Sequence, residues 1–260
     1  MALGHQPAVL VDRNQLVTEV LGEPPRVDLA AAFRWFARLN MHESIANHFS
    51  AAVSADGTKF LMNPRNRHFS QIRASELLLL DSNDARTMER PDAPDPTAWY
   101  IHGRLHANLP KARCLLHLHP KYSTALAALE DNQMYPVDQN TMRFYGRVAI
   151  DNNYSGMALS EEEGDRLARM IGDKPVLMMA NHGVLVAGSS IGMAFDEMYY
   201  FERAAETLVT AYATGKKLRI VSDNIAKLTA SQWVDYPSFA NDHLDQIKAI
   251  LDKEEPEYRS

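Results

Sequence analysis

Two histidines stand two residues apart in the apolar segment CLLHLHP. Side chains two residues apart on a β-strand point to the same face, so His117 and His119 are predicted to project together. Leu116 and Leu118 then face the core, and Pro120 ends the strand where a site can open. Two neutral imidazoles on one face suit a divalent metal ion, but a pair of hydrogen-bonded structural histidines would show the same pattern.

A third histidine, His182, follows a second apolar segment, residues 176–180, in the sequence ANHG. Gly183 allows the backbone to turn tightly beside it. Two ligands alone do not make a metal site, so a third candidate at the end of another strand strengthens the case for His117 and His119. Metal binding is therefore the preferred interpretation of the CLLHLHP segment.

The composition is that of an ordinary soluble globular protein. The 260 residues are 46% hydrophobic and 23% charged, and their net charge of −6 argues against a protein that binds nucleic-acid phosphates. No apolar stretch approaches the roughly 20 residues that cross a bilayer. The first residues, MALGHQPAVLVDRNQL, lack the apolar core of a signal peptide, and the single cysteine, Cys114, fits a reducing compartment. We therefore expect a cytoplasmic protein.

Apolar periodicity and turn residues predict a mixture of strands and helices without a strict βαβ rhythm. Asp56-Gly57 between two apolar segments favours a hairpin. The predicted strands are 47–53, 59–63, 76–81, 111–119, 147–150, 176–180 and 184–187, and the predicted helices are 27–40, 97–108, 122–130, 161–172, 192–214 and 241–252. These elements indicate an α/β fold with helices around a mixed or largely antiparallel sheet. We expect an N-terminal arm at 1–25, a main domain at 26–220 and a C-terminal helical extension at 221–260.

The order of several motifs resembles the class II aldolase/adducin family. HLHP is followed about sixty residues later by NHG and the apolar VLVAG, and residues 47–64, 69–81 and 145–156 are similar to other segments of the family. The resemblance extends from about Asp28 to Thr214. It implies a three-layer α/β/α fold with a central, mostly antiparallel sheet, and homotetramers with active sites at subunit interfaces.

The resemblance also implies a metal site. Enzymes of the family hold zinc or a similar divalent ion on three histidines, which correspond here to His117, His119 and His182. Zinc is the expected metal, with manganese and iron as alternatives. Two acidic residues of the predicted long helix, Glu197 and Glu202, are expected to face solvent or to form ion pairs rather than to act in catalysis.

The chain departs from the sugar-phosphate aldolases of this family at three features. Their glutamate on the helix before the HxH strand falls on Ala98, which has no proton to exchange. Two hydroxyl residues that help to hold substrate phosphate fall on Pro96 and Thr97, and the Thr-Gly of the phosphate loop falls on Arg65 and Asn66. A phosphorylated sugar is therefore not the expected substrate.

Five other residues are candidates for substrate binding or catalysis. His102, one helical turn after the alanine at the glutamate position, could be a ligand or general acid/base, or could only orient a ligand. Tyr145 could donate a proton near the substrate or pack in the core. Asn47 and Ser50 match strand positions that face the substrate in the family, although capping or turn roles fit them equally. Arg65, in the loop NPRNRHF, could bind a substrate carboxylate or face water.

These features predict a divalent-metal-dependent lyase. The ion would stabilise the enolate left when a carbon–carbon bond breaks, so we expect aldol cleavage or decarboxylation of a small unphosphorylated hydroxy-carbonyl or carboxylate substrate. Iron-dependent oxygenation stays open, because a few relatives use the scaffold in that way. Two alternatives lie outside catalysis: an adducin-like binding module without enzymatic activity, and a purely structural ion, which would need a fourth protein ligand.

Overall fold

The computed structural model describes residues 25–236 and 238–260, so the expected arm at 1–25 lies outside the described residues except for its last position. Seven strands form one sheet: β1 His48–Ala52, β2 Lys59–Met62, β3 Leu78–Asp81, β4 Cys114–Leu118, β5 Val148–Asp151, β6 Val176–Met179 and β7 Gly183–Gly188. The α-helices of the described residues are α2 Pro25–Arg38, α3 Pro96–Asn108, α4 Lys121–Ala127, α5 Gln139–Arg143, α6 Glu161–Ile171, α7 Ile191–Ala213, α8 Asp223–Val234 and α9 Ser238–Glu254. None of these helices is long and apolar enough to span a membrane.

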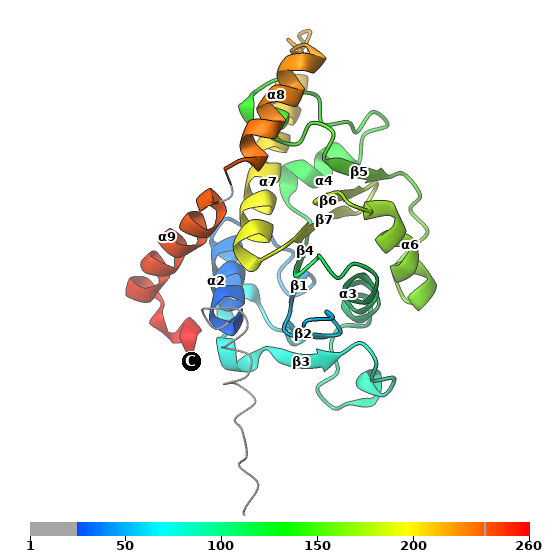
Figure 1. The fold of residues 1–260 in the computed structure, drawn as a ribbon, viewed down its shortest axis with the longest axis vertical. Coiled ribbons are helices and arrows are strands. Elements are labelled where there is room, and N and C mark those ends of the chain that lie inside the picture. Colours follow the sequence, from blue (N-terminus) through cyan, green and yellow to red (C-terminus); the bar gives the residue numbers. More distant parts are fainter. Residues whose placement is uncertain (1–24, 237) are drawn as a thin grey trace, which may run out of the picture.

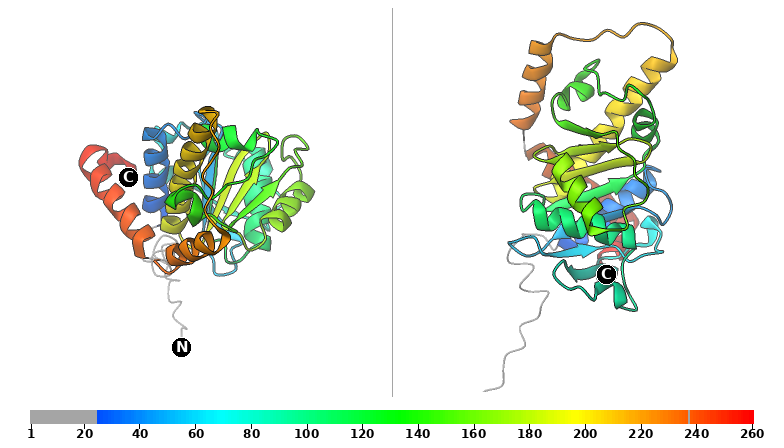
Figure 2. Two further views of the ribbon diagram at one scale, coloured as in Figure 1. Left: turned by 90° about the horizontal axis from the view of Figure 1, so that it is seen from above. Right: turned by 90° about the vertical axis from the view of Figure 1, so that its right-hand side faces the viewer.

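The strands follow the order β3-β2-β1-β4-β7-β6-β5, and every neighbouring pair is antiparallel except the parallel pair β5 and β6. Helices α3 and α6 cover one face of this sheet, and α2 and α7 cover the other (Figures 1 and 2). Helix α9 packs outside α2 and α7. The predicted α/β fold with a mostly antiparallel central sheet is therefore confirmed, as is the hairpin of β1 and β2 around Asp56-Gly57.

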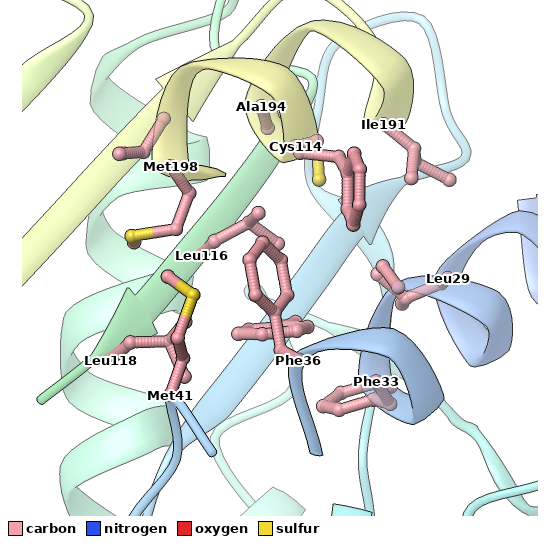
Figure 3. Close-up of a cluster of buried hydrophobic side chains, with 14 of the residues drawn as sticks. Leu29, Phe33, Phe36, Met41, Cys114, Leu116, Leu118, Ile191, Ala194 and Met198 are labelled. Carbon is pink, nitrogen blue, oxygen red and sulfur yellow. The ribbon is translucent and has the colours of Figure 1, made fainter. Parts of the chain in front are cut away.

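Residues of the central strand β4 alternate between two apolar clusters. Leu116 and Leu118 lie among side chains of α2 and α7, including Phe36 and Met198 (Figure 3). Leu115 packs instead with residues of α3 and α6. Because alternate residues of a strand share a face, the side chain after Leu116 points toward α3 and α6, as the sequence predicts for the first histidine of the HxH pair. The strand thus has one apolar face toward α2 and α7, and a second face on which the apolar Leu115 is followed by His117.

Two short or weakly patterned helices were not predicted from the sequence. Helix α8 buries only Ala226 and Ala230, and its larger apolar residues Ile225 and Leu228 are about half exposed. It packs mainly on α5, which has only five residues. Neither helix shows the apolar periodicity that identifies α7 or α6, because neither buries a full face against the sheet. The other expected helices and strands are present with boundaries shifted by a few residues.

Helices α3 and α6 approach each other at a glycine. A methyl group at Gly164 would lie 2.2 Å from the carbonyl oxygen of Tyr100 and 2.8 Å from the Cβ of Arg104. Gly164→Ala should force the two helices apart and lower the free energy of unfolding by about 1–3 kcal/mol, as measured by urea denaturation. Gly103→Ala is the matched control in α3, because its nearest new contact is at 3.9 Å. That control should be neutral or stabilising, and equal losses in both variants would contradict the close packing.

Candidate metal centre

Three histidines come together at one end of the sheet. His117 and His119 lie at the end of β4, and His182 lies in the turn between β6 and β7. The candidate ligand atoms of His117, His119 and His182 all lie within 4.8 Å of one another, and the Nε2 atoms of His117 and His119 are 3.0 Å apart. The Nδ1 of His117 donates a hydrogen bond of 3.1 Å to the carbonyl oxygen of Val184. A carbonyl can only accept, so the proton of His117 sits on Nδ1 and its Nε2 presents a lone pair to the other two rings. The predicted histidine cluster is therefore present.

Burial keeps these imidazoles uncharged at neutral pH. It lowers the pKa of His182 to about 4, lowers the pKa of His119, and lowers the pKa of the fully buried His117 well below its ordinary value. Neutral imidazole is the form that binds a divalent transition metal, so no proton has to leave before an ion binds. Three neutral imidazoles this close together fit an ion such as zinc and leave coordination positions open for other ligands.

The turn between β6 and β7 brings His182 to the pair on β4. Asn181 adopts a left-handed conformation with φ of 57°, which asparagine tolerates better than most residues. Gly183 follows, and a methyl group there would lie 2.4 Å from Cδ2 of His119 and 2.6 Å from the carbonyl oxygen of Leu118. The turn therefore takes its left-handed residue from Asn181 and not from Gly183, and the glycine is required for a different reason from the predicted one: only a hydrogen atom fits beside the His119 ring.

A buried carboxylate fixes the segment that follows His119. Glu202 of α7 accepts hydrogen bonds of 2.8 Å from the backbone N–H groups of Tyr122 and Ser123, and one of 2.5 Å from the Ser123 hydroxyl. It therefore occupies the N-terminus of α4, where a negative charge is favourable. The expectation that Glu202 faces solvent or forms an ion pair is wrong, since it is buried and bound to N–H and O–H groups. Glu197 does form the expected ion pair, with Arg147 at 2.6 Å.

A chain of buried polar groups lies beside the triad, between β1 and α3. The Nδ1 of His48 is 2.8 Å from Nε2 of His102, and the Ser50 hydroxyl lies 2.5 Å from Nδ1 of His102 and 2.7 Å from Nε2 of His106. The chain ends at the carbonyl oxygen of Ala112, 3.1 Å from Nδ1 of His106. Because β1 pairs with β4 so that His48 is opposite His117, the two rings are 4.8 Å apart. We call His48, His102, Ser50 and His106 the histidine–serine chain.

The histidine–serine chain contains two of the predicted site residues, His102 and Ser50. It also contains His48, which sequence reasoning missed. His102 is fully buried and both of its ring nitrogens are bonded within this chain, to His48 and Ser50, so it is not one of the three grouped ligands. Ser50 is also fully buried, which gives its hydroxyl a role inside the protein rather than at a substrate. His48 was missed because it stands alone in the sequence. Its position two residues before Ser50 on a predicted strand is the only signal that placed them on one face.

The remaining candidates make no hydrogen bond to the triad. Arg65 is exposed, and Asn47 accepts a hydrogen bond of 2.6 Å from the backbone N–H of Glu43 while its own Nδ2 has no partner. The Tyr145 hydroxyl donates to Asp223 of α8 at 2.5 Å. Tyr145 precedes β5, whose first residues lie at the end of the sheet opposite the histidines. Within one chain the structure therefore does not bring Tyr145 to the triad.

Ala98 occupies a purely structural position. It is 1% exposed and packs in an apolar cluster with Phe60, Met62 and Leu80. In this chain the position that holds a glutamate in the sugar-phosphate aldolases is therefore part of the core, and no carboxylate from it reaches the histidines.

Buried neutral histidines make stability depend on pH. Burial lowers the pKa of His106 to about 3, far below the value near 6.5 of an unfolded chain. The unfolded state therefore binds the extra proton first. The contribution of His106 is complete above pH 6.5 and is lost as the pH falls toward 3, at about 1.4 kcal/mol per pH unit. Urea denaturation at pH 7.5, 6.0 and 5.0 should show this decrease. His106→Gln, which cannot titrate, should show a slope smaller by about one proton, and an unchanged slope would contradict the assignment.

Gly183 offers a direct test of the triad. Gly183→Ala should push the His119 ring out of place and weaken zinc binding about 10–100-fold, because misorienting a ligand typically has an effect of that size. The measurement is a zinc titration in competition with a chromogenic chelator. Gly146→Ala, at the other end of the sheet, strains a residue with φ of 70° but has nothing within 4 Å of the new methyl group, so it controls for destabilisation without crowding at His119 and should bind zinc like the wild type. Equal affinities in all three proteins would rule out the crowding at His119.

Comparison with known proteins places the chain in a family. It is 31% identical over 191 residues to the "Putative aldolase class 2 protein" of Caulobacter vibrioides, a match that covers 74% of each chain. It is 26% identical over 204 residues to the decarboxylase NovR of Streptomyces niveus, covering 78% of this chain and 73% of NovR. The crystal structure of an aldolase II superfamily protein from Pseudomonas syringae superposes with a TM-score of 0.83 at 28% identity, over 96% of this chain and 98% of the other. Residues 27–209 match the model of the "Class II Aldolase and Adducin N-terminal domain", and the chain belongs to the class II aldolase and adducin family.

Proposed function

We propose that this protein is a divalent-metal-dependent lyase that breaks a carbon–carbon bond in a small unphosphorylated hydroxy-carbonyl or carboxylate substrate. The observation that carries the proposal is the cluster of three neutral imidazoles, His117, His119 and His182, with their candidate ligand atoms within 4.8 Å. Among the described residues, that cluster contains no fourth histidine, cysteine or carboxylate that would close the coordination of an ion. An open set of this kind is typical of catalytic rather than structural sites.

The chemistry divides between the ion and the protein. When bound, a divalent ion supplies a Lewis acid that polarises a substrate oxygen and stabilises a developing enolate. The protein supplies ligands in fixed orientations: the Val184 carbonyl orients His117, and the Glu202 carboxylate holds the helix that starts beside His119. Burial of His117 and of the neighbouring His48 also excludes water from one side of the site. Exclusion of water strengthens the electrostatic interactions on which such stabilisation depends.

Decarboxylation is the reaction class that the residues favour. Proton transfer in an ordinary aldol cleavage relies on the glutamate that Ala98 replaces, and Ala98 is buried among apolar residues. The exposed Arg65 stands where the sugar-phosphate aldolases have the Thr-Gly of their phosphate loop, which supports an unphosphorylated substrate. The similarity to a protein named as a decarboxylase, NovR, supports the same class. A zinc-bound homotetramer is part of this proposal, since class II aldolases are typically oligomeric.

The second candidate is a binding module without catalytic activity, as the adducin part of the family suggests. Ala98 favours it, because loss of the glutamate removes a catalytic group. The intact triad opposes it, because a scaffold does not require three converging neutral imidazoles. The two candidates therefore differ in whether the chain takes up a metal ion and whether that ion supports turnover.

Elemental analysis of the purified protein tests the metal site. We expect about one divalent ion per chain, and none in the double variant His117→Ala, His119→Ala, because a single histidine does not hold an ion. The double variant His42→Ala, His68→Ala is the matched control. Its two imidazole nitrogens are also 3.0 Å apart, but they are not part of a group of three, so its metal content should equal that of the wild type.

Activity assays then separate the candidates. The metal-loaded chain should release carbon dioxide from one member of a panel of 2-hydroxy, 2-keto and aromatic carboxylic acids, and the His117→Ala, His119→Ala variant should not. Release of an aldehyde instead would identify aldol cleavage, and oxygen uptake with iron would identify an oxygenase. If repeated preparations with added zinc, manganese or iron bind nothing, the lyase is refuted and the binding module becomes the better account.

A further inference from the structure

The histidine–serine chain has a single possible order of protons. The Ala112 carbonyl can only accept, so Nδ1 of His106 carries the proton and Nε2 of His106 accepts from the Ser50 hydroxyl. A serine has one proton to donate, so its oxygen must accept from Nδ1 of His102. The Nε2 of His102 then accepts from Nδ1 of His48. Each ring is buried and its hydrogen bonds include none to a carboxylate, so it is a neutral imidazole with one N–H donor and one acceptor nitrogen.

This order of protons leaves an unprotonated nitrogen, Nε2 of His48, at the end of the histidine–serine chain that is nearest the metal ligands. The proton of His48 is on Nδ1, so its Nε2 has a lone pair and no proton. No group among the described residues donates to that atom. The His48 ring is 4.8 Å from that of His117, its directly opposite residue on β4. The Nε2 of His48 does not join the group of three ligand nitrogens.

Packing alone does not account for this arrangement. Three imidazoles and a hydroxyl in a core lose their hydration, and apolar residues of similar volume fill such a space at lower cost. Every internal hydrogen-bonding position of the chain is nevertheless occupied, from the Ala112 carbonyl to Nδ1 of His48. The single open position is on His48, whose ring lies 4.8 Å from that of His117. The network as a whole therefore fixes one hydrogen-bond acceptor, Nε2 of His48.

We propose that His48 is a substrate-binding residue whose Nε2 accepts a hydrogen bond from a substrate hydroxyl group, and that His102, Ser50 and His106 are positioning residues that hold His48 in this tautomer. The proposal rests on the metal-dependent lyase above and specifies its substrate class. A 2-hydroxy acid or 2-hydroxy carbonyl compound presents a donor to His48 while its oxygens face the triad. A compound in which an ether or a second carboxylate replaces the hydroxyl presents only lone pairs and is disfavoured.

The order of protons can be measured without a metal or a substrate. Long-range proton–nitrogen NMR spectra of the full chain should show His48, His102 and His106 all neutral and protonated on Nδ1. Ser50→Ala removes the acceptor for Nδ1 of His102, so His102 should move its proton to Nε2, and His48 should follow. His243→Gln, on α9 and hydrogen-bonded to Asp196, is the control and should leave the three spectra unchanged. A wild-type His48 protonated on Nε2 would overturn the proposal.

The substrate contact is tested with glycolate, which has a hydroxyl group, and methoxyacetate, in which a methyl group replaces the hydroxyl proton. Isothermal titration of the zinc-loaded wild type should show a preference for glycolate that is about tenfold larger than in zinc-loaded His48→Phe, the effect of one hydrogen bond to a buried acceptor. Zinc content should be the same in both proteins. An equal preference in both would refute the contact. If His48→Phe does not fold, Ser50→Ala serves instead and should reduce the same preference.

The two proposals fail in different ways. A wild-type chain that takes up no zinc would refute the lyase and, with it, the substrate contact. A chain that binds zinc but has the opposite tautomer at His48, or the same glycolate preference with and without His48, would refute the role of His48 alone.

Discussion

The structure of the site depends on the cost of burying imidazole rings. A histidine removed from water cannot keep a charge, and a neutral ring must satisfy one donor and one acceptor at the same time. On the α3 side of the sheet this requirement applies to His48, His102, His106 and His117, all of which are buried. A carbonyl oxygen, of Ala112 or Val184, fixes the first donor in each case. Within the histidine–serine chain the lone pairs of His102 and His106 are used, and those left over are on His48 and His117, whose rings are 4.8 Å apart.

Strand order is what makes this convergence possible. Because β1 lies between β2 and β4, His48 is directly opposite His117, although 69 positions separate them in the sequence. The antiparallel turn from β6 to β7 adds His182, and the buried Glu202 holds the start of α4 beside His119. The apolar side of β4, with Leu116 and Leu118 packed among α2 and α7, keeps the strand from rotating. The histidines of β4 are therefore held in place by the close-packed core on the reverse side of the strand.

The sequence predicted those parts of the site that are local. The HxH spacing on a strand and the NHG after another strand identified His117, His119 and His182, because strand geometry alone puts alternate side chains on one face. It did not predict that Ser50 and His102 are bonded to each other, since that contact joins β1 to a helix fifty-two residues later. The role of Glu202 was missed for the same reason: on α7 it reads as one more acidic residue, and only the tertiary structure places it at the start of α4. Helix α8 shows the limit for secondary structure, because a helix that buries so little carries no apolar pattern.

The shared hydroxyl of Ser50 also has a consequence for how this protein can evolve. A single proton on one oxygen sets the polarity of three rings, so a change at any one position leaves an unmatched donor or acceptor at the next. We therefore expect His48, Ser50, His102 and His106 to change together, because a substitution at one of them needs a compensating change at its neighbour. Relatives with a different hydrogen-bond network at this place should differ at several of these positions together, and in the substrates they accept.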